Sequence, residues 1–333
     1  MHKGIIFLLI LILISCESKL DDSKGKFNDL VIISSLEDRS ILEEIIDNNI
    51  FMDTIFTPEP EPLLNKIWIK PEQFKFYKNY SNLVFISISD PIDQTIDLLI
   101  DQFSKNHQIK SFPVILNDVY SSNQSIIIIK ENNQSLFKNT LDSTLVYINS
   151  AIKKHINHLY YKRYKNFKSD TVIANLVHKL FNQSFYFRDD FKIIAQEESN
   201  NLKYLWLGRG DIYSENSNYQ WFIIKDLIGS VSEDNINLLN LIDSNINEII
   251  DDIEVVSKYS KFSIKETNDY KIYKFNGLYN HYGYKTGGPL VSFILKDKND
   301  KKNKIIFGMV NAPGQSKLNS IKELESIVIN SIF

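Results

Sequence analysis

Cysteine, glycine and proline are scarce in this sequence. Its 333 residues contain one cysteine, 11 glycines and 8 prolines. A single thiol excludes an intrachain disulfide and any metal site built from several cysteine ligands. The low glycine and proline contents disfavour collagen-like chains, long flexible linkers and glycine-rich phosphate-binding loops. Stability must therefore come from a hydrophobic core, and the length allows about two domains or one large one.

A charge excess of one sign is also lacking. The chain carries 38 Lys and Arg residues against 41 Asp and Glu residues, which gives a formal net charge of -3. A nucleic-acid-binding protein usually shows a basic excess that neutralises phosphates, so we expect no nucleic acid partner. Hydrophobic residues make up 43% of the chain and charged residues 24%, which is typical of a globular protein.

The first fifteen residues form the pattern of an export signal. Lys3 precedes an unbroken apolar run, Ile5–Ile14, and the sequence turns polar from Glu17. The run has about half of the roughly 20 residues that a transmembrane helix needs. A basic start, a short apolar segment and a polar continuation are typical of a secretory signal peptide, which we assign to residues 1–15.

The end of this signal resembles the lipobox of bacterial lipoproteins. In Leu13-Ile14-Ser15-Cys16 a small residue precedes the cysteine. The resemblance implies that Cys16 becomes the new N-terminus, that its thiol receives diacylglycerol and that its amine is acylated, for example with palmitate. More than one acyl chain makes membrane attachment stable. We therefore expect a membrane partner through lipid at Cys16, a polar tether over residues 16–28, of which residues 21–28 are too hydrophilic to pack, and no thiol elsewhere.

Hydrophobic periodicity predicts an α+β fold, with mixed or antiparallel sheets covered on one face by long amphipathic helices. An N-terminal domain (residues 29–168) ends in a long helix, where Leu145 and Ile148 belong to one apolar stripe. A C-terminal domain (residues 169–333) holds runs of strands between helices. A second long helix is expected over residues 236–256. The similar element order suggests two related αβ halves, although no residue-level repeat is visible.

No complete catalytic set can be assembled from the sequence. Three short motifs follow the order of the penicillin-binding and β-lactamase signatures, namely Ser150–Lys153, Ser214–Asn216 and Lys285–Gly287. However, Ser150 falls inside the predicted long helix instead of at its exposed start. His155 and His158 could share a helix face, but no third ligand accompanies them and neighbouring lysines would repel a cation. We therefore expect no metal and no cofactor, and we favour a protein that is not an enzyme.

A glycine-rich aromatic segment between two predicted strands is the best candidate for a binding surface. Tyr and His combine an apolar ring with a polar tip, and glycine permits close approach of a backbone or ligand. Two interpretations remain open, a tight connection packed on the sheet or a surface for a ligand or partner. In the second, the contributing side chains are Tyr279, His281, Tyr282, Tyr284 and Lys285.

Several short motifs occur in a characteristic order. They are Pro60–Leu63, Tyr80–Val84, Leu205–Arg209, Gly277–Tyr279, Gly287–Ser292, Phe307–Gly314 and Leu324–Ile327. Together they resemble an uncharacterised family of Bacteroidota lipoproteins, a domain of unknown function with a C-terminal Gly-Gly-Pro and Ala-Pro-Gly signature. The sequence departs from that pattern at Ile242–Ser244, where Arg-Asp-Ser is expected, and at Val256–Tyr259, where a Gly-Ser-Tyr-Met turn is expected. The resemblance implies export and lipid attachment and supplies no activity.

These features predict a lipid-anchored cell-envelope protein with a non-catalytic binding or structural role. Its partner would be an envelope protein or a glycan. Two alternatives are an envelope hydrolase that acts on glycan or peptide, with carboxylates brought together from distant segments, and a surface adhesin or scaffold. We expect the outer membrane facing the periplasm, with the cell surface as the alternative, because Ser18, Lys19 and Leu20 interrupt the acidic residues that follow Cys16.

Overall fold

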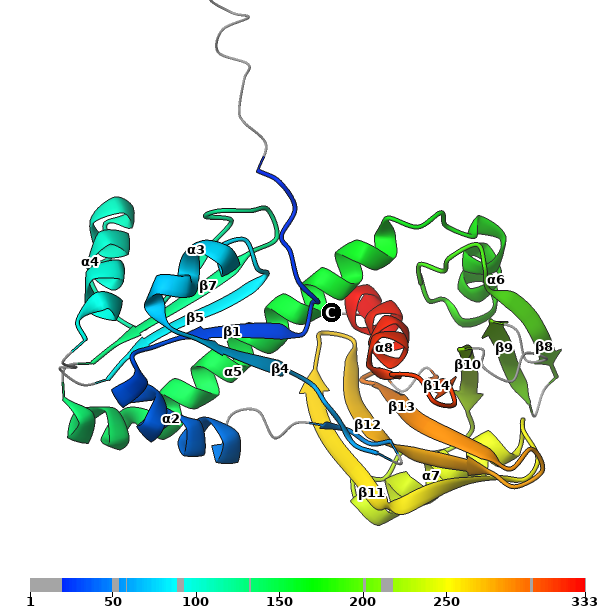
Figure 1. The fold of residues 1–333 in the computed structure, drawn as a ribbon. Coiled ribbons are helices and arrows are strands. Elements are labelled where there is room, and N and C mark those ends of the chain that lie inside the picture. Colours follow the sequence, from blue (N-terminus) through cyan, green and yellow to red (C-terminus); the bar gives the residue numbers. More distant parts are fainter. Residues whose placement is uncertain are drawn as a thin grey trace, which may run out of the picture. The chain divides into compact units, whose positions relative to one another are not determined.

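The computed structural model describes residues 20–49, 54–57, 59–88, 93–131, 133–199, 202–210, 218–299 and 302–332. The chain divides into two compact units, shown as a ribbon in Figure 1. The first unit contains the residues up to 51 together with Leu64–His155, and the second contains Met52–Leu63 together with Ile156–Phe333. The predicted signal peptide and Cys16 lie outside the described residues.

The first unit is built on a five-stranded sheet in which three of the four strand pairs are parallel. Parallel neighbours need crossover connections, which helices supply here. A central strand that is covered on both faces consists almost entirely of apolar residues. Ile126–Ile129, which are all buried, belong to such a strand. In sheet order the strands are β4 (Asn65–Ile69), β1 (Asp29–Ile33), β5 (Asn82–Ser87), β7 (Ser125–Lys130) and β6 (Val114–Asn117). The helices are α2 (Leu36–Asn49), η1 (Pro71–Gln73), α3 (Phe74–Tyr77), α4 (Thr95–His107) and the first part of α5 (Gln134–Lys165).

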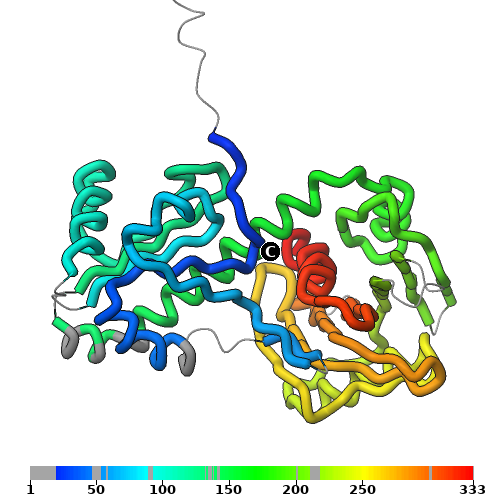
Figure 2. The backbone as a smooth tube through the Cα atoms, in the orientation of Figure 1, coloured from blue at the N-terminus to red at the C-terminus, as the bar shows by residue number. Residues whose placement is uncertain are grey.

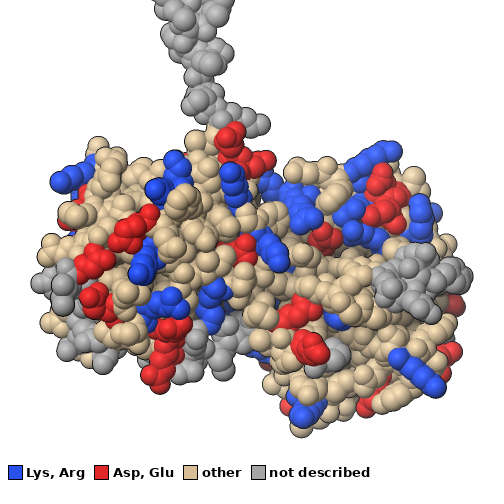
Figure 3. Space-filling view, viewed as in Figure 1, with Lys and Arg blue, Asp and Glu red and all other residues tan. Residues whose placement is uncertain are grey.

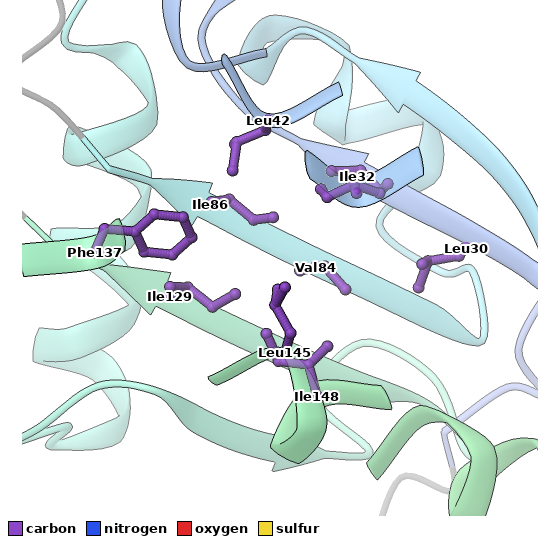
Figure 4. A pocket seen from close by; sticks show the side chains of 10 residues that line it. Leu30, Ile32, Leu42, Val84, Ile86, Ile129, Phe137, Leu145 and Ile148 are labelled. Carbon is purple, nitrogen blue, oxygen red and sulfur yellow. The ribbon is translucent and has the colours of Figure 1, made fainter. Parts of the chain in front are cut away.

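A small apolar cavity lies in this first core (Figure 4). Aliphatic side chains of β1, β5, β7, α2 and α5, with the ring of Phe137, point into it. Its volume is about 10 Å³, which is room for one water at most, and its lining offers no polar partner to hold one. The cavity is therefore a packing gap and not a ligand site.

The polar residues after the predicted anchor are bound to the first unit by backbone hydrogen bonds. Ser23 N donates to Ser122 O at 3.0 Å, and Lys24 N donates to Asn79 O at 2.7 Å. The bridges Asp22↔Ser122 and Lys24↔Tyr80 are parallel. The expectation that residues 21–28 are too hydrophilic to pack is therefore wrong, because main-chain groups hold this segment where apolar side chains could not.

The second unit is built on a seven-stranded sheet in which every neighbouring pair is antiparallel. In sheet order the strands are β11 (Ile253–Glu266), β12 (Tyr270–His281), β13 (Thr286–Asp297), β14 (Asn303–Asn311), β10 (Tyr219–Leu227), β9 (Lys203–Arg209) and β8 (Lys192–Glu198). One face packs against α6 (Thr171–Phe181) and α8 (Leu318–Ile332), and the other against α7 (Asn235–Asn247) (Figure 1).

The α+β class is confirmed, and three details of the prediction are corrected. The second sheet is covered on both faces, not one. The two sheets differ in strand order and direction, so the structure gives no support for two related halves. The predicted second long helix ends at Asn247. A turn follows, in which Asp252 takes a φ of 58°, and burial then alternates along Ile253, Glu254 and Val255, the period of a strand.

Among the described residues, no helix combines the length and the apolar character needed to cross a membrane.

Residues 54–62 form a short two-stranded excursion into the second unit, visible beside β11 and β12 in Figure 2. The strands are β2 (Thr54–Ile55) and β3 (Glu61–Pro62). The Glu61 carboxylate accepts hydrogen bonds from Lys317 N at 2.8 Å and Leu318 N at 3.1 Å, and from Ser316 Oγ at 2.6 Å. Backbone amides at a helix start lack partners within the helix, and a negative charge there is favourable. Glu61 therefore caps α8 from 256 residues away.

We expect Glu61→Ala to lower the free energy of unfolding of the second unit by about 1–2 kcal/mol, the usual cost of losing a helix cap. Urea unfolding followed by the fluorescence of Trp206 and Trp221 measures the loss. Glu59→Ala removes an exposed carboxylate from the same excursion and serves as the control. Equal stability of the two variants would show that the cap contributes nothing.

Ion pairs hold the buried side of α8 to the sheet. Glu323 accepts from Arg209 Nη1 at 2.9 Å, and the Arg209 Nε lies 2.9 Å from Asp190 Oδ2. Glu325 contacts Lys274 of β12 and Lys322, the latter at 3.0 Å. Burial by itself would raise the pKa of Glu325, but the two ammonium groups outweigh it and lower the pKa to about 2. Glu325 is therefore an ionised carboxylate that is only 5% exposed.

Candidate functional site

The predicted binding surface lies on the β12–β13 hairpin, whose strands are joined by residues 282–285. Tyr279 and His281 are buried, with exposures of 1% and 5%. Tyr282 and Tyr284 are exposed, at 62% and 77%, and Lys285 is also exposed with a φ of 50°. The segment is thus a tight connection between strands, and the five candidate residues do not form one surface.

Gly287 and Gly288 of this hairpin lie where the main chains of neighbouring strands come too close for a side chain. A Cβ atom on Gly288 would lie 2.0 Å from the Val310 carbonyl oxygen, and one on Gly287 would lie 2.5 Å from the Tyr279 carbonyl oxygen. Neither glycine has a positive φ. The Gly287-Gly288 pair therefore lets β13 fit between β12 and β14, and its role is structural.

Ring contacts link the hairpin to the core. The His281 ring lies 4.6 Å from that of Tyr284, and its Nδ1 accepts from Tyr284 N at 3.3 Å. Trp221 lies 6.5 Å from His281 and 6.3 Å from Tyr279, between ring centroids. Burial raises the pKa of Tyr279, whose hydroxyl is buried without a hydrogen-bond partner among the described residues. His281 and Tyr279 thus support the hairpin from within, whereas Tyr284 covers His281 from outside.

We expect Tyr279→Phe to leave the free energy of unfolding unchanged or to raise it by up to about 1 kcal/mol. The substitution removes a buried hydroxyl whose desolvation is uncompensated, and it keeps the ring. Thermal and urea unfolding would measure the change. A loss of more than 1 kcal/mol would mean that the hydroxyl has a bound partner, such as a buried water.

A polar pocket that the sequence did not reveal lies at one end of the second sheet. Its volume is about 410 Å³. Four separate segments supply its lining, namely the end of α6, the turn before β12, the end of β13 and the end of α8. The lining residues are Asn182, Gln183, Ser184, Asp269, Tyr270, Asp297, Asn299, Ser331 and Ile332.

The strand register explains why these polar groups meet. Tyr270 of β12 pairs with Asp297 of β13, and both side chains lie on the face that α6 and α8 cover. Asn182 ends α6 in the left-handed conformation, with a φ of 52°, and its amide donates to His178 O. The next residue, Gln183, donates from Nε2 to the Tyr270 hydroxyl at 2.9 Å. The pocket therefore begins where the apolar layer between helices and sheet ends.

Two charged residues, the half-buried Asp226 and the buried Lys304, continue this polar edge across the sheet. Asp226 of β10 pairs with Lys304 of β14 on the same face. Burial raises the pKa of Asp226 and lowers that of Lys304, and in each case the charge of the other opposes the effect. The Lys304 ammonium lies 5.9 Å from the Tyr270 ring centroid. Burial thus makes the charged form of each of these two groups less stable relative to its neutral form.

The charge around the pocket is mostly negative. Asp269 and Asp297 are its ionisable lining groups apart from the Tyr270 phenol, and the C-terminal ends of α6 and α8 add partial negative charge. Lys298 near it is paired with Glu266 at 3.1 Å. On the face of the protein shown in Figure 3, charges of both signs are interspersed.

No group of three or more His, Cys, Asp or Glu side chains within the described residues could hold a metal ion.

The sequence carried no usable signal for this pocket. Asn182, Gln183 and Ser184 follow a helix, and Asp269, Asp297 and Asn299 flank turns, where such residues are common for conformational reasons alone. Only the hairpin register, which no single-sequence pattern fixes, brings Tyr270 opposite Asp297. Ser150 lies within α5, as predicted, and Ser214 of the second serine motif lies outside the described residues.

Comparison with protein families identifies a domain in the second unit. Residues 170–330 match a family described as "Domain of unknown function (DUF4837)". The match begins at Asp170, whose side chain caps α6 by accepting from Ile173 N at 2.9 Å, and it ends in α8. It contains the hairpin and most of the pocket lining. The upstream motifs Pro60–Leu63 and Tyr80–Val84 lie outside the matched range.

Other comparisons add little. No curated protein shows significant sequence similarity to the chain. Among solved structures, the chain is similar to LpqN of Mycobacterium tuberculosis, described as involved in cell envelope biogenesis. The sequence identity is 9%, the TM-score is 0.25, and the match covers 43% of this chain and 78% of LpqN. A likeness at this level carries no argument about fold or function.

Proposed function

We propose that the protein is a lipid-anchored, non-catalytic binding protein of the cell envelope, and that its second unit takes a small polar ligand in the pocket between the ends of α6 and α8. The pocket itself carries the proposal. Its volume of about 410 Å³ is in the usual range for small-molecule sites, and polar groups from four segments converge on it. The lipobox-like residues around Cys16 and the polar sequence after them support the anchor.

Lipid attachment is tested by labelling growing cells with an alkyne-bearing palmitate analogue and separating membranes from soluble material. We expect labelled protein in the outer-membrane fraction, and we expect Cys16→Ser to remove both the label and the sedimentation. Ser18→Ala is the matched control, because it changes a neighbouring residue that the lipobox does not use. Labelling of the Cys16→Ser variant would contradict the anchor.

The orientation of the anchored body has its own test. We propose that it faces the periplasm, with envelope proteins or glycan as its surroundings, and the cell surface is the alternative. A protease added to intact cells should leave a periplasmic body uncut and degrade it only after the outer membrane is opened. Cleavage on intact cells would instead support the surface adhesin or scaffold.

A second candidate function is an envelope hydrolase, and one observation favours it. Asp269 and Asp297 lie in the same pocket, and two carboxylates are the minimum set for hydrolysis of a glycosidic bond. Incubation of the purified protein with envelope glycan and with peptide distinguishes the two functions. The binding protein releases no product, whereas a hydrolase releases product that Asp269→Asn or Asp297→Asn abolishes. Turnover that depends on His281 or Lys285 would likewise contradict the non-catalytic proposal.

A further inference from the structure

The geometry points to a saccharide, either neutral or bearing an ammonium group, as the ligand class of the polar pocket. This inference rests on the proposed binding function and names what the pocket recognises. Its basis is the chemistry of the lining, the sign of the surrounding charge and the fixed positions of the lining groups.

The lining matches the hydrogen-bonding pattern of sugar hydroxyls, each of which both donates and accepts. The side-chain amides of Asn182, Gln183 and Asn299 can donate and accept, and the carboxylates of Asp269 and Asp297 accept. Hydroxyls of Ser184, Ser331 and Tyr270 do both. Ile332 is the one aliphatic residue in the lining. An apolar ligand would leave these polar groups desolvated without partners, which is unfavourable.

The charge of the pocket lining disfavours acidic ligands. Neither lysine, arginine nor histidine occurs among the described residues that line it. The nearby Lys298 is paired with Glu266, and Lys304 is buried, 6% exposed, beside the Tyr270 ring. Two carboxylates and two helix C-terminal ends therefore face the ligand without a compensating cation in the lining. A phosphate or carboxylate group would be repelled, whereas a hydroxyl or ammonium group would be attracted.

The lining groups are held in place by the protein. Asp297 Oδ1 accepts from Asn299 N at 2.7 Å, and Asp297 N donates to Asn303 Oδ1 at 3.0 Å. Ser331 Oγ donates to Ile327 O at 2.8 Å, and Gln183 Nε2 donates to the Tyr270 hydroxyl at 2.9 Å. These contacts orient the lining before a ligand enters and so reduce the entropy lost on binding.

Isothermal titration calorimetry on the full mature chain carrying Cys16→Ser tests the inference. The probes are glucosamine, the disaccharide of N-acetylglucosamine, glucuronic acid and ethanolamine. We expect glucosamine or the disaccharide to bind. We expect glucuronic acid to bind at least about tenfold more weakly, because the charges of Asp269 and Asp297 would repel its carboxylate. Ethanolamine, an amine without a sugar ring, should bind at least tenfold more weakly than glucosamine.

Matched variants place the binding in the pocket. Asp269→Asn should weaken glucosamine binding about tenfold, since it removes a charge-assisted hydrogen bond. Ser331→Trp should abolish binding by filling the space. Asp251→Asn, at an exposed turn outside the pocket, should change nothing. Thermal unfolding of each variant confirms that it is folded.

Failures of the inference and of the proposed function can be told apart. If neither glucosamine nor the disaccharide binds, or if Ser331→Trp leaves their binding intact, the saccharide assignment is wrong. Tighter binding of glucuronic acid would likewise overturn it, while leaving a small-ligand pocket in place. Ethanolamine that binds as well as glucosamine would show an amine site and overturn it too. The lipid anchor is judged separately by the palmitate labelling of Cys16.

Discussion

Replacement of Glu325 by alanine is expected to lower the free energy of unfolding of the second unit by about 3–5 kcal/mol. Glu325 is 5% exposed and lies between the ammonium groups of Lys274 and Lys322. Its removal takes the shared carboxylate from two poorly exposed cations, whose side-chain exposures are 21% and 11%. The loss should also free α8 from β12, since Lys274 belongs to that strand.

The pH dependence of stability provides an independent readout of the same group. The folded-state pKa of Glu325, about 2, lies below its ordinary value of 4.5. A depressed carboxylate pKa stabilises the fold above pH 4.5, and this contribution is lost as the pH falls towards 2. From the two pKa values the contribution is on the order of 3 kcal/mol.

Urea unfolding at pH 6, 4 and 2.5 measures both effects. We expect the difference in stability between the wild type and Glu325→Gln to be largest at pH 6 and to shrink as the pH falls. Glu248→Gln, which changes a half-exposed partner of Lys225 on the other face of the sheet, is the control. A difference that stays constant with pH would mean that Glu325 is not held ionised by the two lysines.

A methyl group at Gly288 is expected to be the most damaging small substitution in the hairpin. The Cβ of Gly288→Ala would lie 2.0 Å from the Val310 carbonyl oxygen, which is main chain of the neighbouring strand and cannot rotate away. The strands β13 and β14 must separate, although they carry residues of both cores of this unit. We expect a loss of about 3 kcal/mol or more in the free energy of unfolding.

Gly283→Ala is the matched control for this prediction. Gly283 lies in the turn of the same hairpin, and its nearest contact would be Asp252 Oδ2 at 3.0 Å, the end of a side chain that can move. We expect a change within about 0.5 kcal/mol. Circular dichroism during thermal unfolding compares the two variants. Equal stability of Gly288→Ala and the wild type would contradict the close packing of β13 against β14.

Much of the fold could be predicted because its patterns are local. The apolar runs Leu30–Ile33 and Ile126–Ile129 are central strands, and the apolar residues of 318–328 form the core side of α8. The failure at residues 236–256 has a local cause as well. Ile249, Ile250 and Ile253 continue the spacing of α7, but the turn at Asp251 and Asp252 changes the period from helical to alternating. Periodicity alone cannot locate such a change.

The candidate site was less predictable because it depends on faces and registers. Tyr279 and His281 alternate with residues that are also covered, such as Leu278 at 8% exposure, so alternation did not show which side faced solvent. The pocket requires two turns and two helix ends to meet, and their residues resemble ordinary turn residues in sequence. The polar side chains at these turns and helix ends can be recognised as one site only once Tyr270 is known to pair with Asp297.

Mapping of ligand-induced shifts in ¹H–¹⁵N spectra tests the central claim most directly. The claim is that the second unit binds its ligand in the pocket at the end of α6 and α8, and not at the exposed hairpin tip. Titration of the mature Cys16→Ser chain with glucosamine should shift the amides of Gln183, Tyr270 and Asn299. Shifts confined to Tyr282, Tyr284 and Lys285, or no shifts at all, would contradict it.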